Sequence, residues 1–136
     1  MGIHDGHRAR MKRRLRESGA DSFDDHQLLE MLLFYAIPRS DVNIHAHRLL
    51  EHFGSLDRVF EATVDELCRV EGIGEHTATL LHLVPQIERR YQIRRNNGLT
   101  KVNSVDQAGR YLLPYFRYEK EEVVYMLCLD VRRRVI

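Results

Sequence analysis

The sequence predicts a mainly α-helical protein: an N-terminal helical bundle with paired helix-hairpin-helix motifs, followed by the first helix and strand of an incomplete α/β domain. Two observations indicate the bundle. Apolar residues recur at helical spacing along most of residues 1–95, and glycine turns separate these apolar stripes. A third observation indicates the α/β part, because residues 122–129 form a nearly continuous apolar run rich in β-branched and aromatic residues.

Composition places the chain among soluble globular proteins. It has 136 residues, of which 43% are hydrophobic and 30% charged, enough apolar material for a core. A net charge of +1 gives no general attraction to nucleic acid, so any such function depends on local charge. No apolar run reaches membrane-spanning length and no signal peptide is visible. Cys68 and Cys128 lie in apolar runs and are predicted to be buried thiols, which favours a cytoplasmic location.

The first predicted helix, His7–Glu17, is strongly basic. Only Met11 and Leu15 form an apolar pair on it, so the helix is expected to lie on the body with its cations outward. Two interpretations stand side by side: the cations collect phosphates, or they form a solvated face opposite the acidic residues at 21, 24 and 25. The cations are Arg8, Arg10, Lys12, Arg13, Arg14 and Arg16.

The second predicted helix, His26–Ala36, is apolar nearly all round and is therefore expected to be the core helix. Asp24 and Gln27 have capping-box spacing at its start, and Pro38 follows its end. A further apolar stripe then continues to Phe53.

Short helices follow on either side of two turns. Gly54 ends the third helix and Ser55 begins a short fourth one, while Thr63 and Glu66 form a capping box for a fifth helix over 64–70. Setting Phe53-Gly54 over Ile73-Gly74 then gives a faint repeat, typical of two helix-hairpin-helix motifs of which the first is degenerate.

The stretch Val70–Ala78 is the candidate binding turn. Gly72 and Gly74 suit a tight turn, with Ile73 between them as an apolar plug. The following helix directs free N–H groups toward the turn, which favours a phosphate oxygen. The alternative is a compact corner with no ligand, and Glu75 supports it because a carboxylate repels phosphate. Candidate nucleic-acid-binding residues are Gly72, Ile73, Gly74, His76, Thr77, Gly54, Ser55, Arg8, Arg10, Arg13 and Arg14.

A polar segment is predicted to divide the chain. A long helix begins at Glu75 and ends in a second basic cluster, Arg89, Arg90, Arg94 and Arg95. Asn96-Asn97-Gly98 then breaks the pattern, so the predicted domains are 1–95 and 104–136 with a linker at 96–103. Ser104 and Gln107 cap another helix, a strand is predicted over 122–129, and a second strand begins at Val135. The chain is therefore expected to be the front part of a longer protein.

Several strings together resemble the bacterial RadC-like family: His7-Arg8-x-Arg10, Leu28–Leu33, Ala36–Val42, His52–Leu56 and Gly72-Ile73-Gly74. The resemblance covers essentially the whole chain and implies a helix-hairpin-helix region similar to the second domain of RuvA, joined to a JAB/MPN domain of the JAMM metalloprotease type. By that resemblance, residues from Ser104 onward begin the MPN domain. The family's His-x-His-Pro-Ser-Gly-Asp metal motif has no counterpart in this chain.

The resemblance and the residues together give two functional hypotheses. The first is a DNA-repair-associated module that binds the DNA backbone weakly and without sequence specificity, tethering a zinc-dependent MPN domain. The second is a protein-interaction or regulatory domain of a zinc metallopeptidase that binds no DNA. No catalytic constellation and no histidine spacing typical of a metal site is visible, so this chain is expected to have no catalytic residue, no metal ligand and no cofactor of its own.

Overall fold

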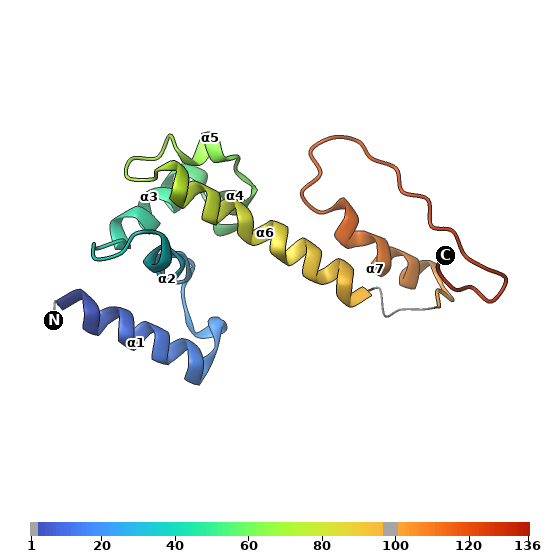
Figure 1. The fold of residues 1–136 in the computed structure, drawn as a ribbon, viewed down its shortest axis with the longest axis horizontal. Helices are drawn as coiled ribbons and strands as arrows, with labels where there is room; N and C mark the ends of the chain where they lie inside the picture. The colour runs from blue at the N-terminus through green and yellow to red at the C-terminus, as the bar shows by residue number, and fades with distance from the viewer. Residues whose placement is uncertain (1–2, 97–100) are drawn as a thin grey trace. The chain divides into compact units, whose positions relative to one another are not determined.

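The computed structural model describes residues 3–96 and 101–136, and its elements are helical throughout (Figure 1). The chain divides into two compact units, Met1–Leu83 and Val84–Ile136. This division falls inside a helix, whereas the predicted linker 96–103 includes residues 97–100, which lie outside the described residues. The domain limits 1–95 and 104–136 therefore stay a prediction.

Unit 1 contains six α-helices and a 3-10 turn within its described part. They are α1 (Ile3–Ser18), η1 (Ala20–Ser22), α2 (Asp25–Ala36), α3 (Asn43–Phe53), α4 (Leu56–Glu61), α5 (Val64–Leu67) and the start of α6 (Glu75–Asn96). Unit 2 contains the remainder of α6 and α7 (Val105–Phe116). The predicted helices are thus present, with α1 and α6 extending beyond their predicted ends.

The predicted helix caps form as hydrogen bonds. At α2, the Gln27 Oε1 accepts from the Asp24 N–H at 3.2 Å. At α5, the Thr63 Oγ1 accepts from the Glu66 N–H at 3.3 Å, and Glu66 Oε2 accepts from the Thr63 N–H at 2.8 Å. These bonds satisfy backbone donors that the first turn of a helix otherwise leaves without partners. Helix starts are therefore encoded locally in this chain.

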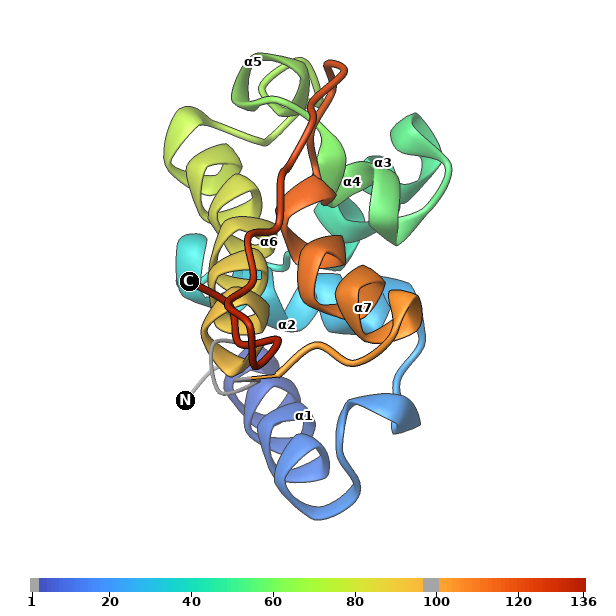
Figure 2. The ribbon, with the colours of Figure 1, turned by 90° about the vertical axis from the view of Figure 1, so that its right-hand side faces the viewer.

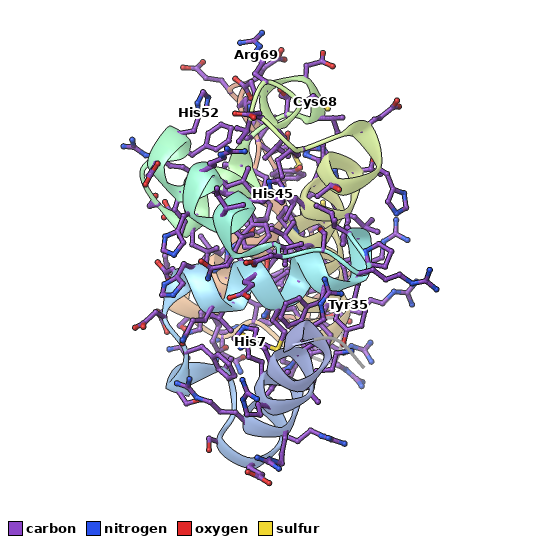
Figure 3. All side chains as sticks on the ribbon, turned by 90° about the vertical axis from the view of Figure 1, so that its left-hand side faces the viewer. His7, Tyr35, His45, His52, Cys68 and Arg69 are labelled. Carbon is purple, nitrogen blue, oxygen red and sulfur yellow. The ribbon has the colours of Figure 1, made fainter. Side chains whose placement is uncertain are left out.

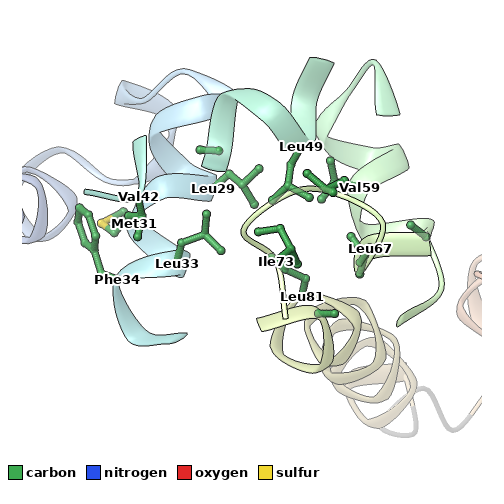
Figure 4. Close-up of a cluster of buried hydrophobic side chains, with 14 of the residues drawn as sticks. Leu29, Met31, Leu33, Phe34, Val42, Leu49, Val59, Leu67, Ile73 and Leu81 are labelled. Atoms are coloured by element: carbon green, nitrogen blue, oxygen red, sulfur yellow. The ribbon is translucent and has the colours of Figure 1, made fainter. Parts of the chain in front are cut away.

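The core of unit 1 forms where α2 meets α3, α4 and the turn before α6 (Figure 4). Leu29 and Leu33 of α2 are fully buried, as are Leu49 of α3 and Leu81 of α6. Ile73, the predicted apolar plug, is 4% exposed, so the turn is packed onto this core. Fully burying an aliphatic side chain of this size contributes about 1.5–3 kcal/mol, which makes the cluster the main stabilising feature of the unit.

Glu30 is a charged residue inside this apolar region. It is 3% exposed, and each of its carboxylate oxygens has a partner from a different helix. Oε1 lies 3.0 Å from His7 Nε2 on α1, and Oε2 accepts from Asn43 Nδ2 on α3 at 3.1 Å. A buried carboxylate without partners would be strongly destabilising, so these two contacts fix α1 and α3 against α2.

Arg8 holds α1 at the other end of α2. Its Nη1 donates to the Phe34 carbonyl at 3.2 Å, and its Nη2 donates to the Ile37 and Ser40 carbonyls at 3.0 and 2.6 Å. The guanidinium also lies 4.7 Å from the centre of the Phe34 ring. A cation at the carbonyl end of a helix is favourable because that end carries partial negative charge. Arg8 therefore has a structural role.

The predicted strand over 122–129 is wrong for the described residues. They contain no strand, only isolated bridges between Lys101 and Arg134 and between Leu129 and Val135. Within the described chain, no backbone hydrogen bond joins residues 122–127 to another segment. A strand requires a neighbouring strand as hydrogen-bonding partner, so this segment is extended without being paired (Figure 2).

The predicted burial of the two cysteines is also wrong. Cys68 and Cys128 are free thiols, and both are exposed. Cys68 directly follows Leu67, whose side chain fills the core position of the short helix α5. Cys128 lies in the extended segment, where alternate side chains face solvent. An apolar run in sequence does not by itself place each of its members in the core.

Among the described residues, no helix has both the length and the apolar character needed to cross a membrane.

The role of Arg8 gives a prediction on stability. Arg8→Ala should lower the free energy of unfolding by about 1–3 kcal/mol, since charged hydrogen bonds to three carbonyls are lost. Arg10→Ala is the matched control on the same helix, because Arg10 is exposed, and it should change stability by less than about 0.5 kcal/mol. Urea denaturation and amide exchange of α1 measure both. Equal effects of the two variants would contradict the anchoring role of Arg8.

Candidate nucleic-acid interface

The second hairpin, residues 71–74 between α5 and α6, is built around a glycine that the fold requires. Gly72 has φ +88, in the left-handed region that favours glycine. A Cβ built on Gly72 would lie 2.2 Å from Cε1 and 2.4 Å from Nδ1 of His45 on α3. The turn is closed by a hydrogen bond from the Ile73 N–H to the Val70 carbonyl at 3.0 Å. Gly72 therefore serves packing against α3.

Gly74 differs from Gly72 in both respects. It does not have a positive φ, and a Cβ built on it would meet nothing within 4 Å. Its carbonyl accepts the first hydrogen bond of α6, from the Ala78 N–H at 2.9 Å. The amides of Glu75, His76 and Thr77 come before that bond, where a helix has no internal acceptors for them. Neither the backbone conformation nor the surrounding packing requires glycine at this position.

The side chains at the start of α6 have different orientations. Glu75 and His76 are exposed, whereas Thr77 is 4% exposed and belongs to the packed face of the helix. Thr77 can therefore offer only its backbone amide to a ligand at the surface. Glu75 stabilises α6 through the helix dipole but places a negative charge beside the free amides. Glu71 is also exposed, and its Oε2 lies 3.4 Å from Nη2 of Arg48 on α3.

The first hairpin, Gly54-Ser55 between α3 and α4, is less suited to an anion. Gly54 has φ +90 and ends α3. Ser55 precedes α4, and a hydrogen bond from its side chain lowers the pKa of the Asp57 carboxyl below its ordinary value. Asp57 is thus a negative charge in the first turn of α4, and α4 has only six residues.

The structure corrects the alignment of the repeat. The glycines with positive φ are Gly54 and Gly72, at +90 and +88, so these two are equivalent in conformation. The sequence alignment paired Gly54 with Gly74, two residues too late. The pairing was attractive because an apolar residue precedes each glycine, but backbone conformation, which the residue type does not reveal, decides equivalence here.

The basic residues predicted on α1 are not gathered with the hairpins. His7 of α1 and Arg69, which follows α5, lie at opposite ends of unit 1 (Figure 3). Arg8 is bound to backbone carbonyls, and the Arg14 guanidinium lies 4.3 Å from the centre of the Phe23 ring. Arg10 and Arg13 are exposed. The candidate residues therefore form two separate surfaces.

Three arginines near the hairpins were missed by the sequence reasoning. Arg48 contacts Glu71, and Arg58 Nη1 lies 3.7 Å from the position of a Cβ on Gly54. Arg69 is exposed in the short segment that leads to the second hairpin, at the end of the unit where His52 also lies (Figure 3). Each of the three is isolated in sequence, so a search for basic clusters passes over them. Their spacing of about one helical turn from Gly54 or Gly72 is the signal that was available.

The histidines do not form a metal centre with one another. In the described parts of the chain, no three His, Cys, Asp or Glu side chains lie close enough together to hold a metal ion. His45 and His47 point to different sides of α3: His45 packs against Gly72, and His47 stacks on His26 with ring centres 4.6 Å apart.

Comparison with known proteins identifies relatives along most of the chain. The model of the UPF0758 N-terminal family matches residues 6–79. A UPF0758 protein of Fusobacterium nucleatum is 33% identical over 96% of this chain and 60% of its own length. UPF0758 proteins of a Geobacillus species and of Ruegeria pomeroyi are 31% and 33% identical, over 57% and 58% of their lengths. The chain thus spans about three fifths of these relatives, and no solved structure matches it.

The two glycines of the second hairpin should respond differently to alanine. Gly72→Ala combines a left-handed backbone with a clash against His45, and it should destabilise unit 1 by about 2–4 kcal/mol. Gly74→Ala introduces a methyl group into open space and should cost about 1 kcal/mol or less. Urea denaturation followed by circular dichroism compares them.

His45→Ala is the internal control for this pair. It removes the ring that the new methyl group meets, so the double variant with Gly72→Ala should recover part of the lost stability. A double variant whose two effects simply add would show that the clash with His45 is not the cause.

Proposed function

The chain belongs to the UPF0758 family, which is the RadC-like family that its sequence motifs indicated, and from this premise we propose that unit 1 binds the sugar-phosphate backbone of DNA. The contact is made by the second hairpin, where the amides of Glu75, His76 and Thr77 at the start of α6 accept a phosphate oxygen. Binding of this kind is independent of base sequence because phosphates are the same at every step.

Gly74 is the observation that carries the proposal. The fold would accept a side chain there, since the backbone has no positive φ and the space beside it is open. A Cβ would instead stand where a phosphate must approach the amides of the first helical turn. A glycine that is unnecessary for the protein itself, at the positive end of a 22-residue helix, fits a ligand that comes close to the backbone.

The surrounding charges make this binding weak. Glu75 lies at the first position of α6, and Asp57 occupies the first turn after the first hairpin. Both carboxylates repel phosphate. Arg69 and Arg58 near the hairpins supply attraction, but few cations are involved, which agrees with a net charge of +1 for the whole chain. The interaction therefore suits a tether that other contacts strengthen.

In the longer relatives, we propose that this helical unit delivers a zinc-dependent MPN domain of the JAMM type to DNA during repair in the cytoplasm. Residues from Ser104 onward would begin that domain. The residues of the zinc motif have no counterpart in this chain, so the proposed hydrolase activity belongs to the whole protein.

A protein-interaction role without DNA binding is the second candidate. It is favoured by the carboxylates of Asp57 and Glu75, each placed in the first turn of the helix that follows a hairpin. In that case both hairpins serve only as corners of the bundle, and unit 1 acts as a regulatory domain of a metallopeptidase.

Zinc content tests the assignment of the metal site to the remainder of the longer relatives. The purified chain should hold no stoichiometric zinc after dialysis, because none of its histidine spacings is typical of a zinc site. Elemental analysis measures this, with a known zinc protein carried through the same dialysis as control. About one zinc per chain would contradict the assignment.

Charge reversal at the second hairpin tests DNA binding. Glu75→Lys should tighten binding to duplex and branched DNA at low salt, because attraction replaces repulsion beside the phosphate. It should also lower stability by about 0.3–1 kcal/mol through the helix dipole. Gly74→Ala should weaken binding. The logarithm of affinity should fall with the logarithm of salt concentration at a slope of about −0.9 per phosphate contacted.

Glu61→Lys is the matched control, since Glu61 is exposed at the end of α4 and the variant has the same net charge. Gel-shift titrations at two salt concentrations measure all the proteins. No binding by the unmodified chain or by Glu75→Lys would refute the DNA hypothesis and favour the protein-interaction role. Equal gains for Glu61→Lys and Glu75→Lys would show that only total charge matters.

A further inference from the structure

The unpaired segment, residues 122–127 after α7, has the side-chain pattern of a strand without a neighbouring strand. Its side chains alternate between half-buried and exposed positions. Val124 is 96% exposed and Met126 is 87% exposed, so the outer row is apolar. Large apolar side chains in a row on a surface mark a site of association.

The inner row is fixed against α7. The Tyr125 ring lies 4.9 Å from the Phe116 ring in an edge-to-face arrangement and 5.6 Å from the Tyr115 ring. Its hydroxyl donates to the Tyr115 carbonyl at 3.3 Å. These contacts hold the segment in one extended conformation, so a partner does not have to order it before pairing.

The backbone of this segment is available along its length. Among the described residues, the first backbone bond after the start of the segment comes at Cys128, whose carbonyl accepts from the Ile136 N–H at 3.1 Å. The donors and acceptors of residues 122–127 are therefore open to a strand of another molecule. An extended chain with open backbone groups and apolar side chains is a template for strand addition.

The charges at the two ends of the segment identify its partner. Glu121 and Glu122 form the acidic end, and both are exposed. Arg132 and Arg133 form the basic turn at the other end, and both are also exposed. Arg134 is already bound to Asp130, with Nε 2.7 Å from Oδ2, and does not join the basic turn. The segment thus carries opposite charges at its ends.

The geometry points to a second copy of this chain as the partner, paired antiparallel through residues 122–127 about a twofold axis. In this arrangement the acidic end of each copy lies toward the basic turn of the other. A parallel arrangement would place Glu121 and Glu122 beside their own copies, and like charges opposite each other destabilise a strand pair. The interface is isologous, so every favourable contact occurs twice. This association is independent of the proposed DNA contact in unit 1.

Sedimentation velocity of the full 136-residue chain over a range of concentrations tests the association. The chain should form a dimer that weakens as salt is raised. Val124→Lys together with Met126→Lys should weaken it by roughly ten-fold or more, because lysines on the outer row oppose strand pairing. Val105→Lys with Leu113→Lys is the control, since these residues of α7 are 90% and 59% exposed and lie outside the segment. A chain that stays monomeric, or a dimer equally sensitive to both pairs, would overturn the proposal.

Reciprocal charge reversal tests the antiparallel arrangement without touching the apolar row. Glu121→Arg with Glu122→Arg makes both ends basic, and Arg132→Glu with Arg133→Glu makes both ends acidic. Each variant alone should dimerise more weakly than the parent chain, and an equimolar mixture should form a heterodimer. Circular dichroism checks that the helices are intact. A mixture that remains as separate monomers, or variants that pair as strongly as the parent, would rule out pairing of the acidic end with the basic turn.

Discussion

The buried carboxylate of Glu30 is the constraint on which the arrangement of unit 1 depends. A charge inside an apolar helix is tolerated only if its oxygens have partners, and here the partners come from α1 and α3. Both helices must therefore occupy fixed positions against α2 before the core of Leu29, Leu33 and Leu49 can close. Arg8 adds a second attachment at the carbonyl end of α2. Residues that look like surface cations in the sequence thus hold the bundle together.

The second hairpin separates two demands that its paired glycines present as one in the sequence. Gly72 meets the demand of the fold, because it adopts a left-handed conformation against the His45 ring. Gly74 meets no such demand and leaves the start of α6 open. The distinction matters for function, since only a position that the fold does not require can be explained by a ligand. The charges nearby, above all Glu75, then set how strongly an anion would be held.

The helices and their caps could be predicted from the sequence because they depend on neighbours in the chain. The capping pairs at Asp24 and Thr63 and the left-handed Gly54 are local features of this kind. The strand over 122–129 could not be predicted correctly, since pairing depends on a partner that residue types do not reveal. The role of Arg8 was missed for the same reason: its carbonyl partners lie 26–32 residues away. At the site, the turn itself was found, while the nearby Arg48, Arg58 and Arg69 were not, because they come together only in the folded unit.

The contact between His45 and Gly72 also restricts the order in which the two positions can change during evolution. A side chain at position 72 must overcome both the ring of His45 and a left-handed backbone. A lineage that first replaces His45 by a smaller residue removes one of these obstacles, and residues that tolerate the left-handed region, such as asparagine, then become accessible. The opposite order passes through a clashing intermediate. The helix α3 therefore sets the mutational history open to a turn nearly thirty residues further along the chain.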